Sequence, residues 1–92
     1  MIENAERSLS GKVALITGAA RRAGRATALK LAADGAAIAL NTRRSADEAA
    51  SVKEEIQALG GKAEVYLCDV TNETAVNDMA ATIAKDLGGV DI

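Results

Sequence analysis

The sequence predicts an α/β fold, in which helices cover both faces of a parallel β-sheet. Three observations support this. Short aliphatic runs alternate three times with segments of helical spacing along the 92 residues. The turns between them are short and rich in glycine, and the chain contains no proline. A βαβαβα order with short turns implies parallel strands joined by right-handed crossovers. We therefore expect a polar leader over residues 1–10 and one α/β module over residues 11–92.

The first strand and helix follow directly from the leader. Residues 13–16 form a continuous apolar run, typical of a strand buried on both faces of a parallel sheet. Helical spacing begins at Gly24, and Gly35 is the expected helix stop. The inner face of this helix is expected to consist of small and aliphatic residues: Ala28, Leu31 and Ala32. The second strand is expected at residues 36–40.

The second helix is expected to start with a capping box, in which the Ser45 and Glu48 side chains bond to backbone N–H groups. Gly60 and Gly61 end it, and the third strand is expected at residues 63–68. Its expected inner stripe has helical spacing: Ala49, Val52, Ile56 and Leu59.

Thr71 or Asn72 is expected to cap the third helix, which Gly88 and Gly89 end. Residues 90–92 are expected to be the start of a fourth strand. The apolar positions that should face the sheet are Val76, Met79, Ala80, Ile83 and Leu87.

Composition narrows the function classes. The net charge is −2, which gives no reason to expect nucleic acid or an anionic membrane as partner. One cysteine, Cys68, cannot form an internal disulfide and fits a reducing cytoplasm, where it is expected to be buried and unreactive. With no histidine, no metal site is expected. The N-terminus lacks a signal-peptide pattern, and no apolar run approaches the ~20 residues of a membrane span.

The loop after the first strand, residues 17–24, has the clearest chemical signature. A strand that turns through glycine into a helix leaves unpaired N–H groups at the positive end of the helix dipole, which favours a diphosphate. Gly18 permits the sharp exit, and Gly24 permits close packing against the strand. The spacing differs from the G-x-G-x-x-G fingerprint, so an ordinary turn remains an alternative.

The neighbouring residues resemble a known family. Residues 17–24 look like the Thr-Gly-x-x-x-Gly-x-Gly loop of the short-chain dehydrogenase/reductase family, and Asp69 and Val70 resemble the Asp-Val pair after its third strand. Residues 59–63 and 89–92 also match, so the resemblance covers nearly all of residues 10–92. It implies a three-layer Rossmann-type, doubly wound sheet with strand order 3-2-1-4. Arg22 replaces the middle glycine, as in pteridine-reductase-like members.

The charge pattern favours NADP(H) over NAD(H). NAD-binding relatives carry an acid at the end of the second strand, where this chain has Thr42 followed by Arg43 and Arg44. Arginine suits a 2′-phosphate because it makes charge-assisted, often bidentate contacts, and Arg21 in the loop is a second basic group of the NADP-preferring kind. A solvated basic face is the alternative. A nucleic-acid patch is disfavoured because Tyr66 is the only aromatic residue.

The resemblance also implies that Asp69 accepts a hydrogen bond from the adenine amino group, with Val70 offering its backbone. The alternative is that Asp69 caps the third helix. The loop, the basic run and the end of the third strand together predict the cofactor-binding residues: Gly18, Ala20, Arg21, Arg22, Ala23, Gly24, Thr42, Arg43, Arg44, Asp69 and Val70.

No catalytic residue is assigned. In this family a Tyr-x-x-x-Lys pair, supported by Ser and Asn, does the chemistry, but Tyr66 is followed four positions later by Val70 and lies inside a strand, where packing is its expected role. We therefore expect the N-terminal part of a longer carbonyl reductase or alcohol dehydrogenase, inactive as the isolated chain. Residues 13–16 would form an exposed apolar edge that favours homo-oligomers.

Two alternatives to this function remain at the level of sequence. The first is a non-catalytic nucleotide-binding or regulatory module, which the missing Tyr-x-x-x-Lys pair favours. The second is a flavodoxin-like or other α/β domain whose ligand is not a dinucleotide. The loop at residues 17–24, together with Asp69 and Val70, argues against the second.

Overall fold

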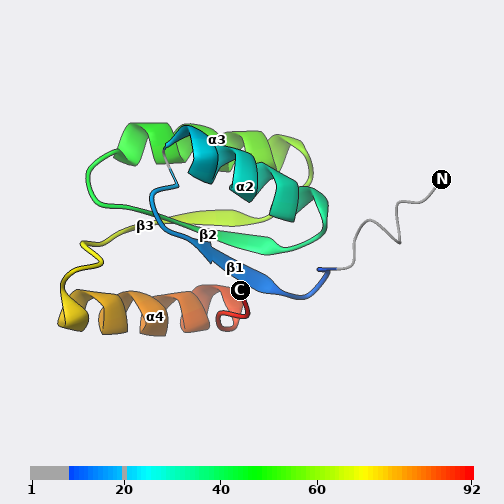
Figure 1. Cartoon of the computed structure of the whole chain (residues 1–92). Helices are drawn as coiled ribbons and strands as arrows, with labels where there is room; N and C mark the ends of the chain where they lie inside the picture. The colour runs from blue at the N-terminus through cyan, green and yellow to red at the C-terminus, as the bar shows by residue number, and fades with distance from the viewer. Residues whose placement is uncertain (1–8, 20) are drawn as a thin grey trace.

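The computed structural model describes residues 9–19 and 21–92, and within them it confirms the α/β prediction. Three parallel strands lie in the order β1-β2-β3, with Ile16 beside Leu40 and Thr42 beside Leu67. Helices α2 and α3 cover one face of the sheet and α4 covers the other (Figure 1). The elements are β1 (Val13–Ile16), α2 (Arg22–Ala33), β2 (Ala37–Thr42), α3 (Ala46–Ala58), β3 (Ala63–Leu67) and α4 (Glu73–Leu87).

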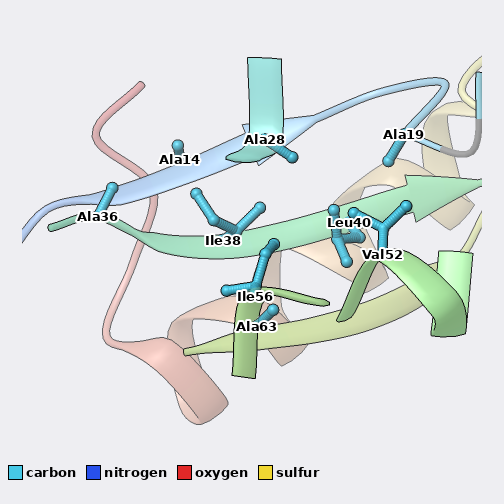
Figure 2. Packing of buried hydrophobic residues seen from close by; sticks show 9 residues of the cluster. All are labelled: Ala14, Ala19, Ala28, Ala36, Ile38, Leu40, Val52, Ile56 and Ala63. Atoms are coloured by element: carbon cyan, nitrogen blue, oxygen red, sulfur yellow. The ribbon is translucent and has the colours of Figure 1, made fainter. Parts of the chain in front are cut away.

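The two faces of β2 carry the two halves of the core. Ile38 and Leu40 point toward α2 and α3, where they pack with Val52 and Ile56 (Figure 2). Ala39, between them in sequence, joins the cluster under α4. Successive side chains of a strand point to opposite faces, so a strand covered on both sides is apolar at nearly every position. This explains the continuous aliphatic runs.

Two predicted core positions are wrong. Leu59 is 64% exposed, because it is the C-cap of α3 and lies beyond Ile56, the last buried residue of that helix. Ala80 is exposed because α4 presents a narrow stripe to the sheet, built on Met79 and Ile83. One residue along an α-helix is a rotation of about 100°, which carries Ala80 away from that stripe.

The helix ends agree only in part with the sequence pattern. The capping box at Ser45 is wrong: its side chain makes no cap bond, and its own N–H donates to Thr42 Oγ1 at 3.2 Å. Asn72, one of two candidates, caps α4 by accepting the Ala75 N–H at 3.0 Å. Gly88 ends the same helix in the left-handed conformation at φ +99, as the sequence indicates.

Residues 90–92 lie along β1 without forming a regular strand. The N–H groups of Asp91 and Ile92 donate to Val13 O at 2.8 and 3.1 Å, and Leu15 N–H donates to Ile92 O at 3.0 Å. The Asp91 carboxylate accepts the Val13 N–H at 2.9 Å. The prediction of an exposed edge is therefore wrong at Val13 and Leu15, whose backbone groups form hydrogen bonds with this segment.

Candidate functional site

An open cleft of about 710 Å³ lies at the carboxyl ends of the three parallel strands. Three segments line it: the turn after β1 with the start of α2, the end of β2 with the following loop, and the residues just after β3. Open α/β sheets bind their ligands at this edge. A second hollow, of about 510 Å³, lies at the opposite edge near Lys12 and Lys62 and contains none of the predicted site residues.

Glycine shapes the turn after β1 as expected. Gly18 has φ +62, a left-handed conformation that disfavours other residues. A Cβ on Gly24 would overlap the Gly18 carbonyl oxygen and approach Ala19 Cα to 3.0 Å. Gly24 therefore allows close approach to the turn itself, rather than to the strand as predicted. The turn is held from β2, because Ala19 N–H donates to Asn41 O at 2.9 Å.

The N-terminus of α2 differs from those of the other two helices in the described part of the chain. Its N-cap, Arg21, makes no side-chain cap bond, and its first turn contains no acid. By contrast, α3 has Asp47 and Glu48 in its first turn, and α4 has both a cap bond and Glu73. The first N–H groups of a helix have no intrahelical acceptor and lie at the positive end of its dipole. The start of α2 is therefore chemically suited to an anion.

The loop after β2 brings basic side chains to the same cleft. Arg43 and Arg44 line it together with Arg21 from the α2 N-terminus. Thr42 is only 6% exposed, and its hydroxyl accepts the Ser45 N–H, so this position presents no charge. The Arg43 side chain is 61% exposed, with Nη2 at 3.4 Å from Asp69 Oδ2.

Asp69 is held by its own loop. Its Oδ1 accepts the Thr71 hydroxyl at 2.6 Å and the Thr71 N–H at 2.9 Å. The pKa of this carboxyl is held below its ordinary value. The largest cause is the hydrogen bond from the Thr71 hydroxyl, followed by the bond from the Thr71 N–H and by the charges of Arg43 and Arg44. The alternative that Asp69 caps the next helix is wrong, because Asn72 has that role.

Of the eleven predicted residues, nine line this cleft. They are Gly18, Arg21, Ala23, Gly24, Thr42, Arg43, Arg44, Asp69 and Val70. Arg22, the first residue of α2, is exposed and is not part of the lining. Ala20 lies outside the described residues.

Sequence reasoning missed Asn41. This residue lines the cleft and is 2% exposed, and its amide Nδ2 donates to the carbonyls of Tyr66 and Cys68, both at 3.2 Å. A signal was present: an amide among the aliphatic residues of a buried strand must find partners to offset its desolvation. Thr71, which holds Asp69, was also missed.

Tyr66 lies under α4, away from the cleft, and has the packing role expected of it. Its hydroxyl donates to Asp86 Oδ2 at 3.0 Å. The pKa of Tyr66 is raised to about 12. Burial is the largest cause, followed by the hydrogen bond to Asp86 and by the charges of Asp86 and Glu64. Cys68 is a free, buried thiol. Within residues 9–19 and 21–92, no group of three or more His, Cys, Asp or Glu is placed to hold a metal ion. No helix in this described part combines the length and apolar character of a membrane span.

The family model described as short chain dehydrogenase matches residues 12–92. The chain belongs to the short-chain dehydrogenase/reductase family. It is 44% identical over 84 residues to the short-chain dehydrogenase/reductase ARMGADRAFT_1018421 of Armillaria gallica, covering 89% of this chain and 32% of that protein. It is 41% identical over 81 residues to the homolog YusS of Bacillus subtilis, covering 88% of this chain and 74% of that protein.

Solved structures of this family agree with the fold. A metagenomic short-chain oxidoreductase in complex with NADP superimposes with a TM-score of 0.85 at 39% identity, over 92% of this chain and 38% of its own. NAD⁺-bound xylitol dehydrogenase superimposes with a TM-score of 0.86 at 38% identity, over 91% of this chain and 32% of its own. The Rossmann-type prediction is confirmed, and the chain spans about a third of the length of most of these relatives. Membership of an oxidoreductase family disfavours the non-catalytic alternative.

Proposed function

We propose that this short-chain dehydrogenase/reductase transfers a hydride between NADP(H) and a carbonyl or alcohol substrate, and that residues 11–92 form its cofactor-binding part. The observation that supports it most is the gathering of Arg21, Arg43 and Arg44 around a cleft whose strand-end position, Thr42, is uncharged. Because the two cofactor-bound neighbours described above hold NADP and NAD⁺, the choice rests on the residues of this chain.

The start of α2 fits the diphosphate of a dinucleotide. Its first N–H groups have no acceptor within the helix, and no acidic side chain in the first turn opposes an anion. Gly24 leaves the turn free of the Cβ that would force it open. In this proposal Gly18, Ala23 and Gly24 provide the backbone surface, and Arg21 adds a positive charge beside it.

The end of β2 fits a 2′-phosphate. A carboxylate at position 42 would repel that group, whereas Thr42 is neutral and its hydroxyl is engaged by Ser45. Arg43 and Arg44 follow at once and line the same cleft, where a guanidinium forms charge-assisted bonds to phosphate oxygens. Asp69 and Val70 on the facing wall are proposed to contact the adenine.

When bound, the cofactor would supply or accept the hydride, while the residues of this chain bind and orient it. We assign no catalytic residue within the 92 residues and expect the chain alone to bind cofactor without reductase turnover. We further propose a cytoplasmic homo-oligomer, with no nucleic-acid or membrane partner. The buried free thiol of Cys68 supports a reducing compartment.

Calorimetric titration of the chain with NADP⁺ and NAD⁺ tests this function. We expect tighter binding of NADP⁺, and a loss of about tenfold or more for Arg43→Ala, since a hydrogen bond to a charged group contributes roughly 1.5–3 kcal/mol. Arg43→Ala should leave NAD⁺ affinity nearly unchanged. Arg22→Ala is the matched control, because it removes an arginine of the same region that does not line the cleft. Tighter binding of NAD⁺, or no binding of either, would overturn the proposal.

A further inference from the structure

Asn41 lines the cleft, and its side-chain amide is buried. Asn41 and Thr42 are the two buried polar residues of the described chain, and Asn41 is 2% exposed. Burying an amide without hydrogen bonds is costly, so a buried Asn in a strand indicates specific partners. In ladder register Asn41 lies beside Tyr66.

The partners of this amide lie where β3 ends. Nδ2 donates to Tyr66 O and Cys68 O, both at 3.2 Å, and lies 3.6 Å from Met79 Sδ. The strand stops at Leu67, between these two carbonyls, and one further ladder bond runs from Cys68 N–H to Thr42 O at 3.1 Å. The side chain of Asn41 thus binds the backbone on both sides of the strand end, immediately before Asp69.

The main chain of Asn41 contacts the glycine turn, on the opposite side of the cleft from the end of β3. Its carbonyl oxygen accepts the Ala19 N–H at 2.9 Å, which holds the glycine turn against β2. One residue therefore contacts both walls of the cleft, but by different groups. Replacing the side chain removes the bonds to Tyr66 and Cys68 and keeps the backbone bond to Ala19.

We propose that Asn41 is a positioning residue that sets where Asp69 and Val70 stand relative to the glycine turn. Asp69 Oδ2 lies 3.4 Å from Arg43 Nη2. By positioning Asp69, the Asn41 side chain therefore also influences where the Arg43 guanidinium lies. This inference rests on the proposed function for its ligand, and its structural part is independent of any ligand. It assigns Asn41 an effect on the adenosine end of the cofactor and none on the diphosphate end.

The first test is amide hydrogen exchange of the free chain, comparing Asn41→Ala with Ile38→Val. Ile38 is fully buried on the same strand but packs on the other face, so its variant reports general destabilisation. We expect the Cys68 amide of Asn41→Ala to exchange about tenfold faster, as one or two ordinary hydrogen bonds would give, while the Ala19 amide stays protected. Equal loss of protection at Cys68 and Ala19 would overturn the proposal, since that is the pattern of a merely structural role. Asn41→Ser provides the same comparison if Asn41→Ala does not fold.

The second test is a double-mutant cycle on NADP⁺ affinity. If Asn41 acts through the β3 wall, Asn41→Ala and Asp69→Ala should each weaken binding about tenfold, and the double variant little more than the stronger single one. Arg21 lies beside the glycine turn, on the other side of the cleft. In the double variant of Asn41→Ala and Arg21→Ala, the two losses of NADP⁺ affinity should therefore multiply. Independent effects of Asn41 and Asp69 would overturn the proposal. Failure of the unchanged chain to bind NADP⁺ or NAD⁺ would instead refute the proposed function, and the exchange comparison would still decide the role of Asn41.

Discussion

Replacing Gly24 by Ala tests whether the start of α2 is packed against the glycine turn as closely as the structure shows. The added Cβ would overlap the Gly18 carbonyl oxygen, and it would lie 3.0 Å from Ala19 Cα and 3.1 Å from Gly18 C. All three contacts are backbone atoms, and the turn that contains them is tied to Asn41 O through the Ala19 N–H. No flexible side chain is available to move aside, so the helix and the turn must separate.

Two opposing effects set the magnitude. Alanine is the better helix former by about 1 kcal/mol, whereas overpacking a tight contact costs about 1–3 kcal/mol. We expect the contact to dominate and the free energy of unfolding to fall by about 1 kcal/mol, a shift in Tm of about 4–8 °C for a domain of this size. Because the separation displaces the N–H groups at the start of α2, NADP⁺ affinity should fall at least about tenfold.

Thermal unfolding and calorimetric titration measure the two effects separately. Ala26→Gly is the matched control: it lies on the exposed side of the same helix, costs about 1 kcal/mol of helix stability, and should leave NADP⁺ affinity unchanged. If Gly24→Ala melts at or above the unchanged chain and binds NADP⁺ equally well, the reasoning from close packing is wrong.

Three further predictions concern the pKa of Tyr66, the N-terminal caps of α3 and α4, and the pKa of Asp69. The raised pKa of Tyr66, about 12, means that burial favours the neutral phenol; its contribution to stability is complete below pH 10 and is lost as pH rises through about 12. Asp86→Asn should lower this pKa part of the way, which tyrosinate absorbance measures directly because the chain has one tyrosine. Asn72→Ala should reduce the free energy of unfolding by about 1 kcal/mol in thermal melts, while Ser45→Ala changes it little. The pKa of Asp69 is lowered, first by the hydroxyl bond it accepts, so its contribution is present above the ordinary value near 3.8 and is lost as pH falls through the lowered value. Urea unfolding of Asp69→Asn should therefore show a shallower acid dependence than the unchanged chain.

Each of these predictions has a contrary result. A Tyr66 pKa that does not move in Asp86→Asn would mean that burial and the charge of Glu64 raise it without any contribution from Asp86. Equal losses for Asn72→Ala and Ser45→Ala would contradict the assigned caps. An acid dependence of Asp69→Asn as steep as that of the unchanged chain would show that the Asp69 carboxylate does not stabilise the fold.

Local periodicity was sufficient to predict the strands and the helices, and the family was predicted from the resemblance of residues 17–24, Asp69 and Val70 to its motifs. The aliphatic run at residues 13–16 reflects a strand that is buried on both sheet faces, and strands of this kind alternate with helical segments along the rest of the chain. Such burial makes consecutive residues apolar, so a short window of sequence is enough to recognise it. Gly18 and the Asn72 cap are likewise local, since each depends on a conformation or bond within three residues. The predictions failed where a position depends on how far a packed surface extends, as at Leu59 and Ala80.

The amino-acid sequence by itself determined the order of the elements, the glycine turn and the concentration of arginines near the cleft. The tertiary structure decided which groups meet: Arg43 with Asp69, Asn41 with the carbonyls of Tyr66 and Cys68, and the backbone of β1 with Asp91. The physical reason is that turn and helix preferences act over a few residues. The contacts of Asn41 and Asp91 join positions 25 and 78 residues apart, which come together only when strands pair and helices pack on the sheet.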